Sequence, residues 1–217
     1  MGSFDPFSFE DILQKGVCVV EIRIENGEKR FGEKILFTGL NCRMDFQRHA
    51  LYRITGESGK GKTTLLRILA SLESLDKGEL QYLFGEAARG MDAWKISMLF
   101  QENRLLEKCS GLENLRIALP MLSKKEILEA LSVFFQEEDF QEKVENYSGG
   151  MKRRLSFLRA MLYPSEIILL DEPFTGLDEE NRKKVEEYLL QRRRNRPVIF
   201  VSHENPFLWK DYACISL

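Results

Sequence analysis

Residues 50–63 read ALYRITGESGKGKT, so that an apolar run leads directly into a glycine-rich segment. The segment Gly56–Thr63 fits the pattern of glycine, any four residues, glycine, lysine, and serine or threonine. We expect a strand over Ala50–Thr55 and a helix over Thr63–Leu72, so that backbone N–H groups and the helix N-terminus converge on a phosphate chain. An accidental glycine-rich turn is the alternative, and the flanking strand and helix disfavour it.

Each residue type in this loop has a physical role toward phosphate. The glycines let the main chain approach closely, Lys62 supplies a charge for β- and γ-phosphates, and Thr63 offers a hydroxyl group to Mg²⁺. The expected nucleotide-binding residues of the loop are Gly56, Glu57, Ser58, Gly59, Lys60, Gly61, Lys62, Thr63 and Thr64.

An acidic pair follows a second apolar run, IILLDE, over residues 167–172. A buried strand there would deliver Asp171 to the ligand edge of a parallel sheet, where it can organise Mg²⁺. Glu172 could polarise a water for attack on the γ-phosphorus. Taken alone, an Asp-Glu pair after a strand is more often a helix N-cap in a solvated turn. The phosphate loop favours the functional interpretation.

The composition excludes several classes of protein. With 217 residues, of which 43% are hydrophobic and 30% charged, the chain suits one globular domain, and its net charge of −2 gives no field for nucleic acid. Nothing resembles a signal peptide, and the aliphatic runs are far too short to cross a bilayer, so no direct membrane insertion is expected. The four thiols, Cys18, Cys42, Cys109 and Cys214, are scattered, and only His49 and His203 could join them, so a zinc site is not expected. The thiols are expected to be reduced.

Alternating strand-like and helix-like segments predict an α/β fold: a P-loop NTPase core with a mainly parallel sheet flanked by helices. An antiparallel β portion is expected near the N-terminus, with a turn at Asn26-Gly27. Helix formers dominate between Asn103 and Tyr147, and Ser123 with Glu126 forms a capping box, which indicates a small inserted helical subdomain. The other expected strands are Val17–Ile24, Ile35–Phe37, Cys42–Phe46, Glu166–Leu170 and, as the last buried strand, Val198–Val201. The other expected helices are Met151–Tyr163 and Glu179–Arg194, and a short end closes with Ala213–Leu217.

The segment Tyr147-Ser148-Gly149-Gly150-Met151 opens a predicted helix before the acidic strand. Together with the phosphate loop and the acidic pair, it resembles the ATP-binding cassette (ABC) ATPase family, whose signature is Leu-Ser-Gly-Gly-Gln. The resemblance extends from about Val17 to Leu217. Further matches stand in family order: Gln101 in LFQE resembles the Q-loop glutamine, Gly176-Leu177-Asp178 the D-loop, and His203 in VSHE the switch histidine.

The resemblance implies roles for these residues. Glu172, His203 and Gln101 would be catalytic, and Thr63, Gln101 and Asp171 would bind Mg²⁺. Ser148, Gly149 and Gly150 would cap the γ-phosphate of ATP held by a second ABC subunit, identical or homologous, and Asp178 would act across that interface. Read alone, Ser-Gly-Gly is a helix cap, His203 a structural histidine, and Asp178 the cap of a helix beginning near Glu179.

Some positions depart from the family pattern. Tyr147 and Met151 replace the leucine and glutamine of the signature. Phe31 is the best match for the aromatic residue that stacks on adenine, although it could be a core residue. By resemblance the domain divides into 1–102, the first part of the ATP-binding core; 103–155, the helical subdomain with the signature; and 156–217, the second part of the core.

The implied function is an ATP-binding and ATP-hydrolysing subunit of an ABC transporter, with ATP and Mg²⁺ as cofactors. It would lie in the cytoplasm on the inner face of the cell membrane, held by a membrane-spanning permease subunit that inserts a helix near Leu105 and Leu106. The alternative is a non-transport ABC ATPase of repair, translation or cofactor assembly. Only 46 residues separate Gln101 from Ser148, which leaves no room for the coiled coil of repair members.

Two further interpretations carry less weight. A small-molecule kinase would use the phosphate loop but would leave the Ser-Gly-Gly segment and His203 without a role. The basic cluster Arg192, Arg193, Arg194 and Arg196 is predicted to be the solvated end of a helix rather than a site for nucleic acid.

Overall fold

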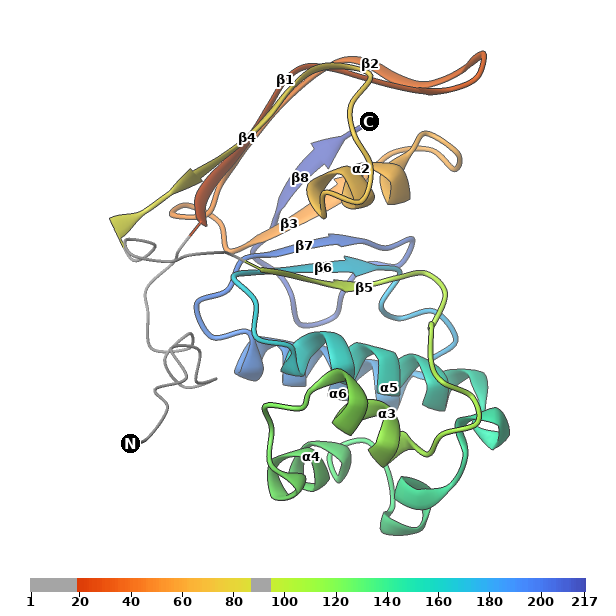
Figure 1. Ribbon diagram of the computed structural model, residues 1–217. Coiled ribbons are helices and arrows are strands. Elements are labelled where there is room, and N and C mark those ends of the chain that lie inside the picture. Colours follow the sequence, from red (N-terminus) through yellow and green to blue (C-terminus); the bar gives the residue numbers. More distant parts are fainter. Residues whose placement is uncertain (1–18, 87–94) are drawn as a thin grey trace, which may run out of the picture.

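Two β-sheets organise the chain in the computed structural model, which describes residues 19–86 and 95–217 (Figure 1). The first is antiparallel with strand order β2-β1-β4, formed by β1 (Val19–Phe31), β2 (Lys34–Asp45) and β4 (Lys77–Phe84). The second is parallel with order β5-β6-β7-β3-β8. Its strands are β3 (Leu51–Thr55), β5 (Ile96–Leu99), β6 (Ile167–Asp171), β7 (Val198–Val201) and β8 (Ala213–Ser216).

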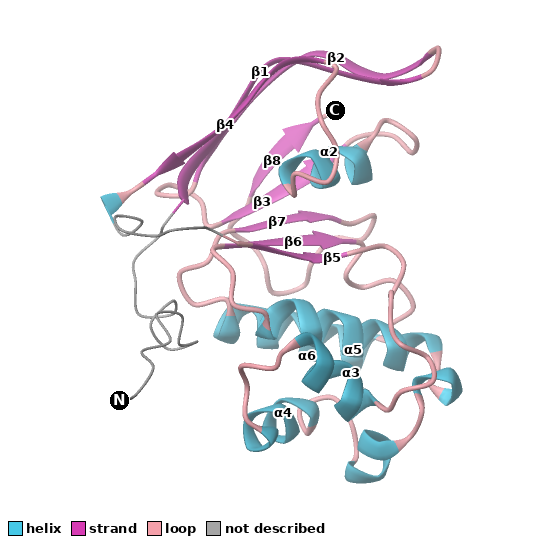
Figure 2. Cartoon of the chain, in the orientation of Figure 1, coloured by secondary structure: helices cyan, strands magenta, loops and turns pink. Residues whose placement is uncertain are grey.

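Helices cover both faces of the parallel sheet (Figure 2). Helix α2 (Lys62–Leu69) packs between this sheet and the antiparallel one, whereas α5 (Gly149–Leu162) and α6 (Glu179–Arg192) lie on the opposite face. Alternate residues of β6 enter the two cores: Ile167 and Leu169 face the α2 side, and Ile168 and Leu170 face the α5 side. This alternation explains why the strand is apolar at every position from 167 to 170.

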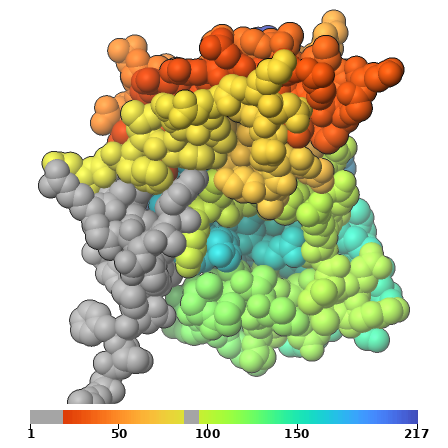
Figure 3. All heavy atoms as spheres, turned by 45° about the horizontal axis from the view of Figure 1, so that its top comes forward, coloured from red at the N-terminus to blue at the C-terminus, as the bar shows by residue number. Residues whose placement is uncertain are grey.

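The helical subdomain extends from the face that carries α5. It contains α3 (Gly111–Ala118), α4 (Lys124–Leu131) and the 3₁₀ turns Glu137–Gln141 and Val144–Asn146. Capping boxes begin both helices, at Ser110 with Glu113 and at Ser123 with Glu126, so the predicted box is confirmed. In Figure 3 the subdomain, in green, lies opposite the orange and yellow N-terminal part, and cyan residues are visible between them.

The predicted turn at Asn26-Gly27 is wrong. Strand β1 continues through both residues with a register shift between Ile24 and Gly27, and the hairpin turn lies at Gly32-Glu33. An Asn-Gly pair favours a hairpin, but here it forms a bulge because β1 is the central strand, paired on both sides. The two short strands predicted over 35–46 are one strand, β2, which pairs with β1 from Lys34 to Asp45. Val17 and Cys18 lie outside the described residues.

The basic cluster is only partly solvated, as Arg196 is buried. Its guanidinium group donates hydrogen bonds to the carbonyl oxygens of Met161, Tyr163 and Arg192 at 3.0–3.2 Å. These carbonyls belong to the C-terminal ends of α5 and α6, where a cation is electrostatically favoured. The prediction of a fully solvated cluster is therefore wrong for Arg196, whereas Arg192 and Arg194 are exposed.

Within the residues that the structure describes, no helix combines the length and apolar character needed to span a membrane.

Candidate functional site

Four loops of the parallel sheet open into one cleft of about 380 Å³. Because parallel strands end at the same edge, the loops after β3, β5, β6 and β7 meet there, and the β1–β2 hairpin adds a wall. Eleven predicted site residues line this cleft: Phe31, Ser58, Gly59, Gly61, Lys62, Thr63, Thr64, Gln101, Asp171, Glu172 and His203. Lys34 also lines it, which the sequence interpretation missed.

The glycine-rich loop leaves the N-terminus of α2 open to an anion. Gly61 is the N-cap with φ +93°, and a Cβ atom there would lie 3.1 Å from the Leu36 side chain, so the position requires glycine. Among the residues that the structure describes, no side chain caps α2, and its first turn holds no acidic residue, so its N–H groups and positive end face the cleft. The Lys62 ammonium group donates to the carbonyls of Gly56 and Glu57, each at 2.9 Å.

Asp171 and Glu172 lie at the end of β6 in different environments. Asp171 is 1% exposed, and burial, together with the neighbouring Glu172 carboxylate, raises the pKa of its carboxyl group, while the Thr63 hydroxyl and Arg153 lower it. Glu172 has a left-handed backbone, φ +52°, which is uncommon for a residue with a side chain. This turn directs its carboxylate toward the loop after β7.

Glu172 and His203 form a pair within the cleft. The Glu172 Oε2 atom accepts a hydrogen bond from the His203 backbone N–H at 3.1 Å, and His203 Nε2 lies 3.5 Å from Glu172 Oε1. The imidazole is 67% exposed, whereas the Glu172 side chain is 13% exposed. A carboxylate beside a histidine at the mouth of a phosphate-binding cleft can orient and deprotonate a water molecule.

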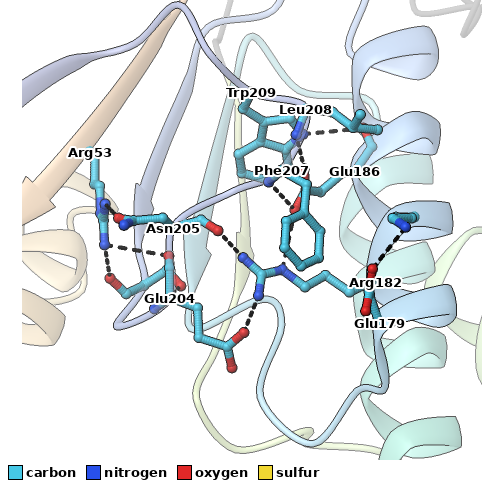
Figure 4. A network of polar contacts seen from close by, with 11 residues as sticks. Arg53, Glu179, Arg182, Glu186, Glu204, Asn205, Phe207, Leu208 and Trp209 are labelled. Atoms are coloured by element: carbon cyan, nitrogen blue, oxygen red, sulfur yellow. Dashed lines mark hydrogen bonds and ion pairs between the residues drawn. The ribbon is translucent and has the colours of Figure 1, made fainter.

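Two arginines fix the backbone of the His203 loop, as Figure 4 shows. Arg53 of β3 donates to the Ser202 carbonyl at 2.8 Å and to Asn205 Oδ1 at 2.6 Å. On the other side, Arg182 of α6 donates to the Asn205 carbonyl and pairs with Glu204. The backbone around His203 is thus held while its side chain remains free to face Glu172.

The buried carboxylate of Glu186 completes this network. It accepts from Arg182 Nε at 3.3 Å and from the backbone N–H groups of Phe207 and Leu208 at 3.0 and 2.6 Å (Figure 4). The Arg182 guanidinium group also lies 4.0 Å from the centre of the Phe207 ring, a cation–π distance. Sequence reasoning missed this network, because its members stand in distant segments without a motif.

The Ser-Gly-Gly segment lies at the exposed N-terminus of α5 and does not line the cleft of its own chain. Ser148 is the N-cap, and its Oγ accepts from the Met151 N–H at 3.2 Å. Nothing in the described part of the chain lies within 4 Å of a Cβ atom placed on Gly149, whereas on Gly150 such an atom would lie 3.1 Å from the Gly176 carbonyl. The helix tip is therefore open and touches the segment before Asp178.

Tyr147, which stands where the family signature has leucine, is buried behind this tip. Its hydroxyl donates to the Asp139 carbonyl at 2.5 Å, and its ring stacks on Phe135 at 5.7 Å. The hydroxyl also approaches Gly111, where a Cβ atom would lie only 2.5 Å away. The departure from the signature thus changes packing inside the helical subdomain and leaves Ser148 exposed.

Two other predicted residues have clear placements. Asp178 is the N-cap of α6, where its Oδ1 accepts from the Asn181 N–H at 2.8 Å, so it does form the helix cap considered for it. Phe31 is 51% exposed at the mouth of the cleft, which excludes a core role. Near the Q-loop, Leu105 packs against the core and Leu106 is exposed.

Comparisons with known proteins agree with this geometry. A family model described as ABC transporter matches residues 40–175, more than half of the chain. A Chlorella vulgaris protein named "probable sulfate/thiosulfate import ATP-binding protein CysA" is 34% identical over 196 residues, which are 85% of this chain and 81% of that protein. The spermidine/putrescine import ATP-binding protein PotA of Haemophilus influenzae is 33% identical over 193 residues, or 84% of this chain, which spans only about half (51%) of that relative.

Solved structures give the same result. The dimeric structure of MJ0796, a bacterial ABC transporter cassette, has a TM-score of 0.68 and 26% identity, covering 84% of this chain and 88% of that one. Its post-hydrolysis dimer bound to ADP and Pi has the same TM-score at 24% identity and supports the fold alone. The predicted family and α/β fold are confirmed. The chain belongs to the ABC transporter family, of which it is an ATP-binding cassette.

Proposed function

We propose that this chain binds and hydrolyses ATP to drive transport through a separate membrane-spanning permease subunit. The observation that carries the proposal is the single cleft that joins the phosphate loop to Asp171, Glu172 and His203. The relatives named as import ATP-binding proteins support a transport role. A peripheral position on the cytoplasmic face of the membrane follows from such a permease.

Within the cleft, the loop residues 56–64 hold the phosphates and Phe31 stacks on the adenine. Lys62 leaves its carbonyl partners for the β- and γ-phosphates, since a charged phosphate oxygen is a stronger acceptor than a neutral carbonyl. Glu172 is the general base toward the attacking water, and His203 and Gln101 help to hold that water and the γ-phosphate.

Thr63, Asp171 and Gln101 would hold Mg²⁺. Both side-chain oxygens of Asp171 are buried, and neither has a hydrogen bond of normal geometry within residues 19–86 and 95–217. Carboxylate, hydroxyl and amide oxygens are the hard ligands that Mg²⁺ prefers, so the residues present fit this ion. When bound, Mg²⁺ supplies positive charge next to the β- and γ-phosphate oxygens.

A second ABC subunit, either another copy of this chain or a homologue, would complete each site. Ser148, Gly149 and Gly150 form an exposed helix N-terminus outside the cleft of their own chain, which suits the γ-phosphate on a partner subunit. Asp178 contacts the same interface from the segment beside Gly150. The dimeric cassette MJ0796 supports this arrangement.

The test is ATP hydrolysis by the purified chain, with and without Mg²⁺, compared with Glu172→Gln. We expect the variant to keep its ATP affinity, to lose about 100-fold or more in kcat, because the general base is gone, and to elute as an ATP-dependent dimer on size exclusion. Wild-type turnover by Glu172→Gln would refute the role of Glu172. Unchanged hydrolysis after removal of Mg²⁺ would refute the metal site.

A further inference from the structure

Arg153 connects two of the segments that line the cleft. It lies on α5, five residues after Ser148, and is 3% exposed. Its guanidinium group donates to the carbonyl oxygens of Phe100 at 2.6 Å and Gln101 at 3.2 Å on the Q-loop side. It also donates to the carbonyl oxygens of Asp171 and of Glu172, the latter at 2.7 Å.

These hydrogen bonds join the ends of β5 and β6 at the point where the ladder between the two strands stops. The ladder between β5 and β6 ends at Leu99 and Leu170, so Phe100 and Gln101 have left it, whereas Asp171 is still paired with Val201 of β7 and Glu172 follows the end of β6. A planar guanidinium group carries several donors in a fixed geometry, and here it bridges the two loop backbones that a ladder no longer joins.

The backbone that Arg153 holds is one that needs support. Glu172 has φ +52°, a conformation that persists in a residue with a side chain only when its surroundings impose it. The Glu172 N–H donates to the Val201 carbonyl at 2.8 Å, and its carbonyl accepts from Arg153. Both ends of this residue are therefore fixed, and with them the direction of its carboxylate.

Arg153 is also charged near the reacting groups. Burial lowers the pKa of its guanidinium group to about 10, while Asp171 and Glu172 act to raise it, so the group is a cation at neutral pH. A buried cation beside two carboxylates offsets part of their mutual repulsion. A neutral side chain of the same length would provide neither the charge nor the hydrogen bonds.

We propose that Arg153 is a positioning residue for ATP hydrolysis, which fixes the Gln101 and Glu172 backbones relative to each other and joins both to the helix that carries Ser148. This inference rests on the proposed function, in which Glu172 is the general base. Five residues of α-helix span only about 7.5 Å, so a displacement of the helix tip by the nucleotide of a partner subunit moves Arg153 with it. Nucleotide binding at one site thereby affects the position of the general base, Glu172, at the other site.

The test compares Arg153→Met and Arg153→Lys with a matched control, Arg159→Met. Arg159 lies six residues further along α5 and donates to the carbonyls of Asn103 and Arg104 at 3.1 and 2.8 Å, so its bonds are of the same kind but do not reach Glu172. Steady-state kinetics and equilibrium binding of a fluorescent ATP analogue separate kcat from affinity, and thermal unfolding checks the fold.

We expect Arg153→Met to lower kcat about 10- to 100-fold, since a small misplacement of a catalytic group has an effect of this size, with ATP affinity within about twofold of wild type. Arg153→Lys should be intermediate, and Arg159→Met should be close to wild type. In the Glu172→Gln background, Arg153→Met should have little further effect, because a group that acts through Glu172 has nothing left to position.

Each other outcome overturns the inference. Wild-type kcat in Arg153→Met while Glu172→Gln is inactive refutes the positioning role alone, as does an equal loss in both backgrounds. Loss of ATP binding in both Arg153 variants also overturns it, because the residue would then support the nucleotide site itself rather than the position of Glu172. Wild-type turnover by Glu172→Gln refutes the proposed base and the positioning role together.

Discussion

Replacing Gly111 with alanine should destabilise this protein, and removing the Tyr147 hydroxyl should abolish that effect. A Cβ atom on residue 111 would lie 2.5 Å from Tyr147 Oη, well inside van der Waals contact. The tyrosine cannot move aside, because its ring is buried against Phe135 and its hydroxyl is bonded to the Asp139 carbonyl. Without the hydroxyl, the nearest remaining atom, Cζ, would lie at an ordinary 3.4 Å.

The structure sets the size of the effect. Forcing an extra carbon into a packed site costs about 1–3 kcal/mol, and the gain from replacing glycine in a helix offsets up to about 1 kcal/mol of it. Tyr147→Phe alone should cost about 1 kcal/mol through the lost hydrogen bond. In the Tyr147→Phe background the steric cost is absent and the helix gain remains, so Gly111→Ala should be neutral or slightly stabilising there. The coupling energy between the two positions should then equal the steric cost, about 1–3 kcal/mol.

Urea denaturation of the four proteins measures this cycle, and thermal unfolding should show a loss of about 3–6 °C for Gly111→Ala, from the usual relation of free energy to Tm. Gly149→Ala is the matched control, because Gly149 is also the first residue of a helix and a Cβ atom there meets nothing within 4 Å in the described part of the chain. An equal destabilisation by Gly111→Ala in the wild-type and Tyr147→Phe backgrounds would show that the Tyr147 hydroxyl is not what residue 111 meets.

Three other changes test separate parts of the structure. Lys62→Ala should weaken ATP binding about 10-fold or more, since a charged hydrogen bond to phosphate is lost, and unchanged affinity in a fluorescence titration would reject its assigned role. Glu186→Gln should lower the free energy of unfolding by about 3 kcal/mol, because it removes the buried charge that pairs with Arg182 and accepts from two backbone N–H groups. Exposed Glu187→Gln should change that free energy by less than about 0.5 kcal/mol, and equal effects of the two variants in urea denaturation would contradict the network. Asp171→Asn should stabilise the nucleotide-free protein at neutral pH, because the pKa of Asp171 is raised in the folded state and its ionisation destabilises the fold as pH rises through that pKa. The gain in the free energy of unfolding should vanish below the ordinary pKa of aspartate, near 4. A gain that does not depend on pH would contradict this.

The sequence predicted those elements whose local signals agree with their environment. Strands β6 and β7 are buried on both faces and read as unbroken apolar runs, and the loop before α2 has a pattern that phosphate binding imposes. Strand β5 has only four residues, ISML, too few to show a period, and it was missed. Helix α3 was missed although Ser110 and Glu113 spell a capping box, so that signal was available.

The site was predictable in part because its residues meet at one edge of a parallel sheet. A residue at the carboxyl end of such a strand, as Asp171 is, or just after it, as His203 and Gln101 are, lies near the cleft whatever the rest of the chain does. Lys34 reaches the same cleft from the antiparallel sheet, and only the packing of two sheets brings it there. No pattern around residue 34 encodes that contact.

Buried arginines explain why the supports of this site escape a reading of the sequence. Arg153 and Arg182 each donate to backbone carbonyls of segments that are distant in the chain, and each is less than 10% exposed. An exposed and a buried arginine look alike in a sequence, because the chemistry of the side chain suits both water and a set of carbonyls. The loops that hold the cleft have left the sheet and cannot use its ladder, so their carbonyls need donors from elsewhere. Arginine, with five donors on a long stem, meets this need from a neighbouring helix, which is why changes in α5 and α6 should reach catalysis without touching the nucleotide.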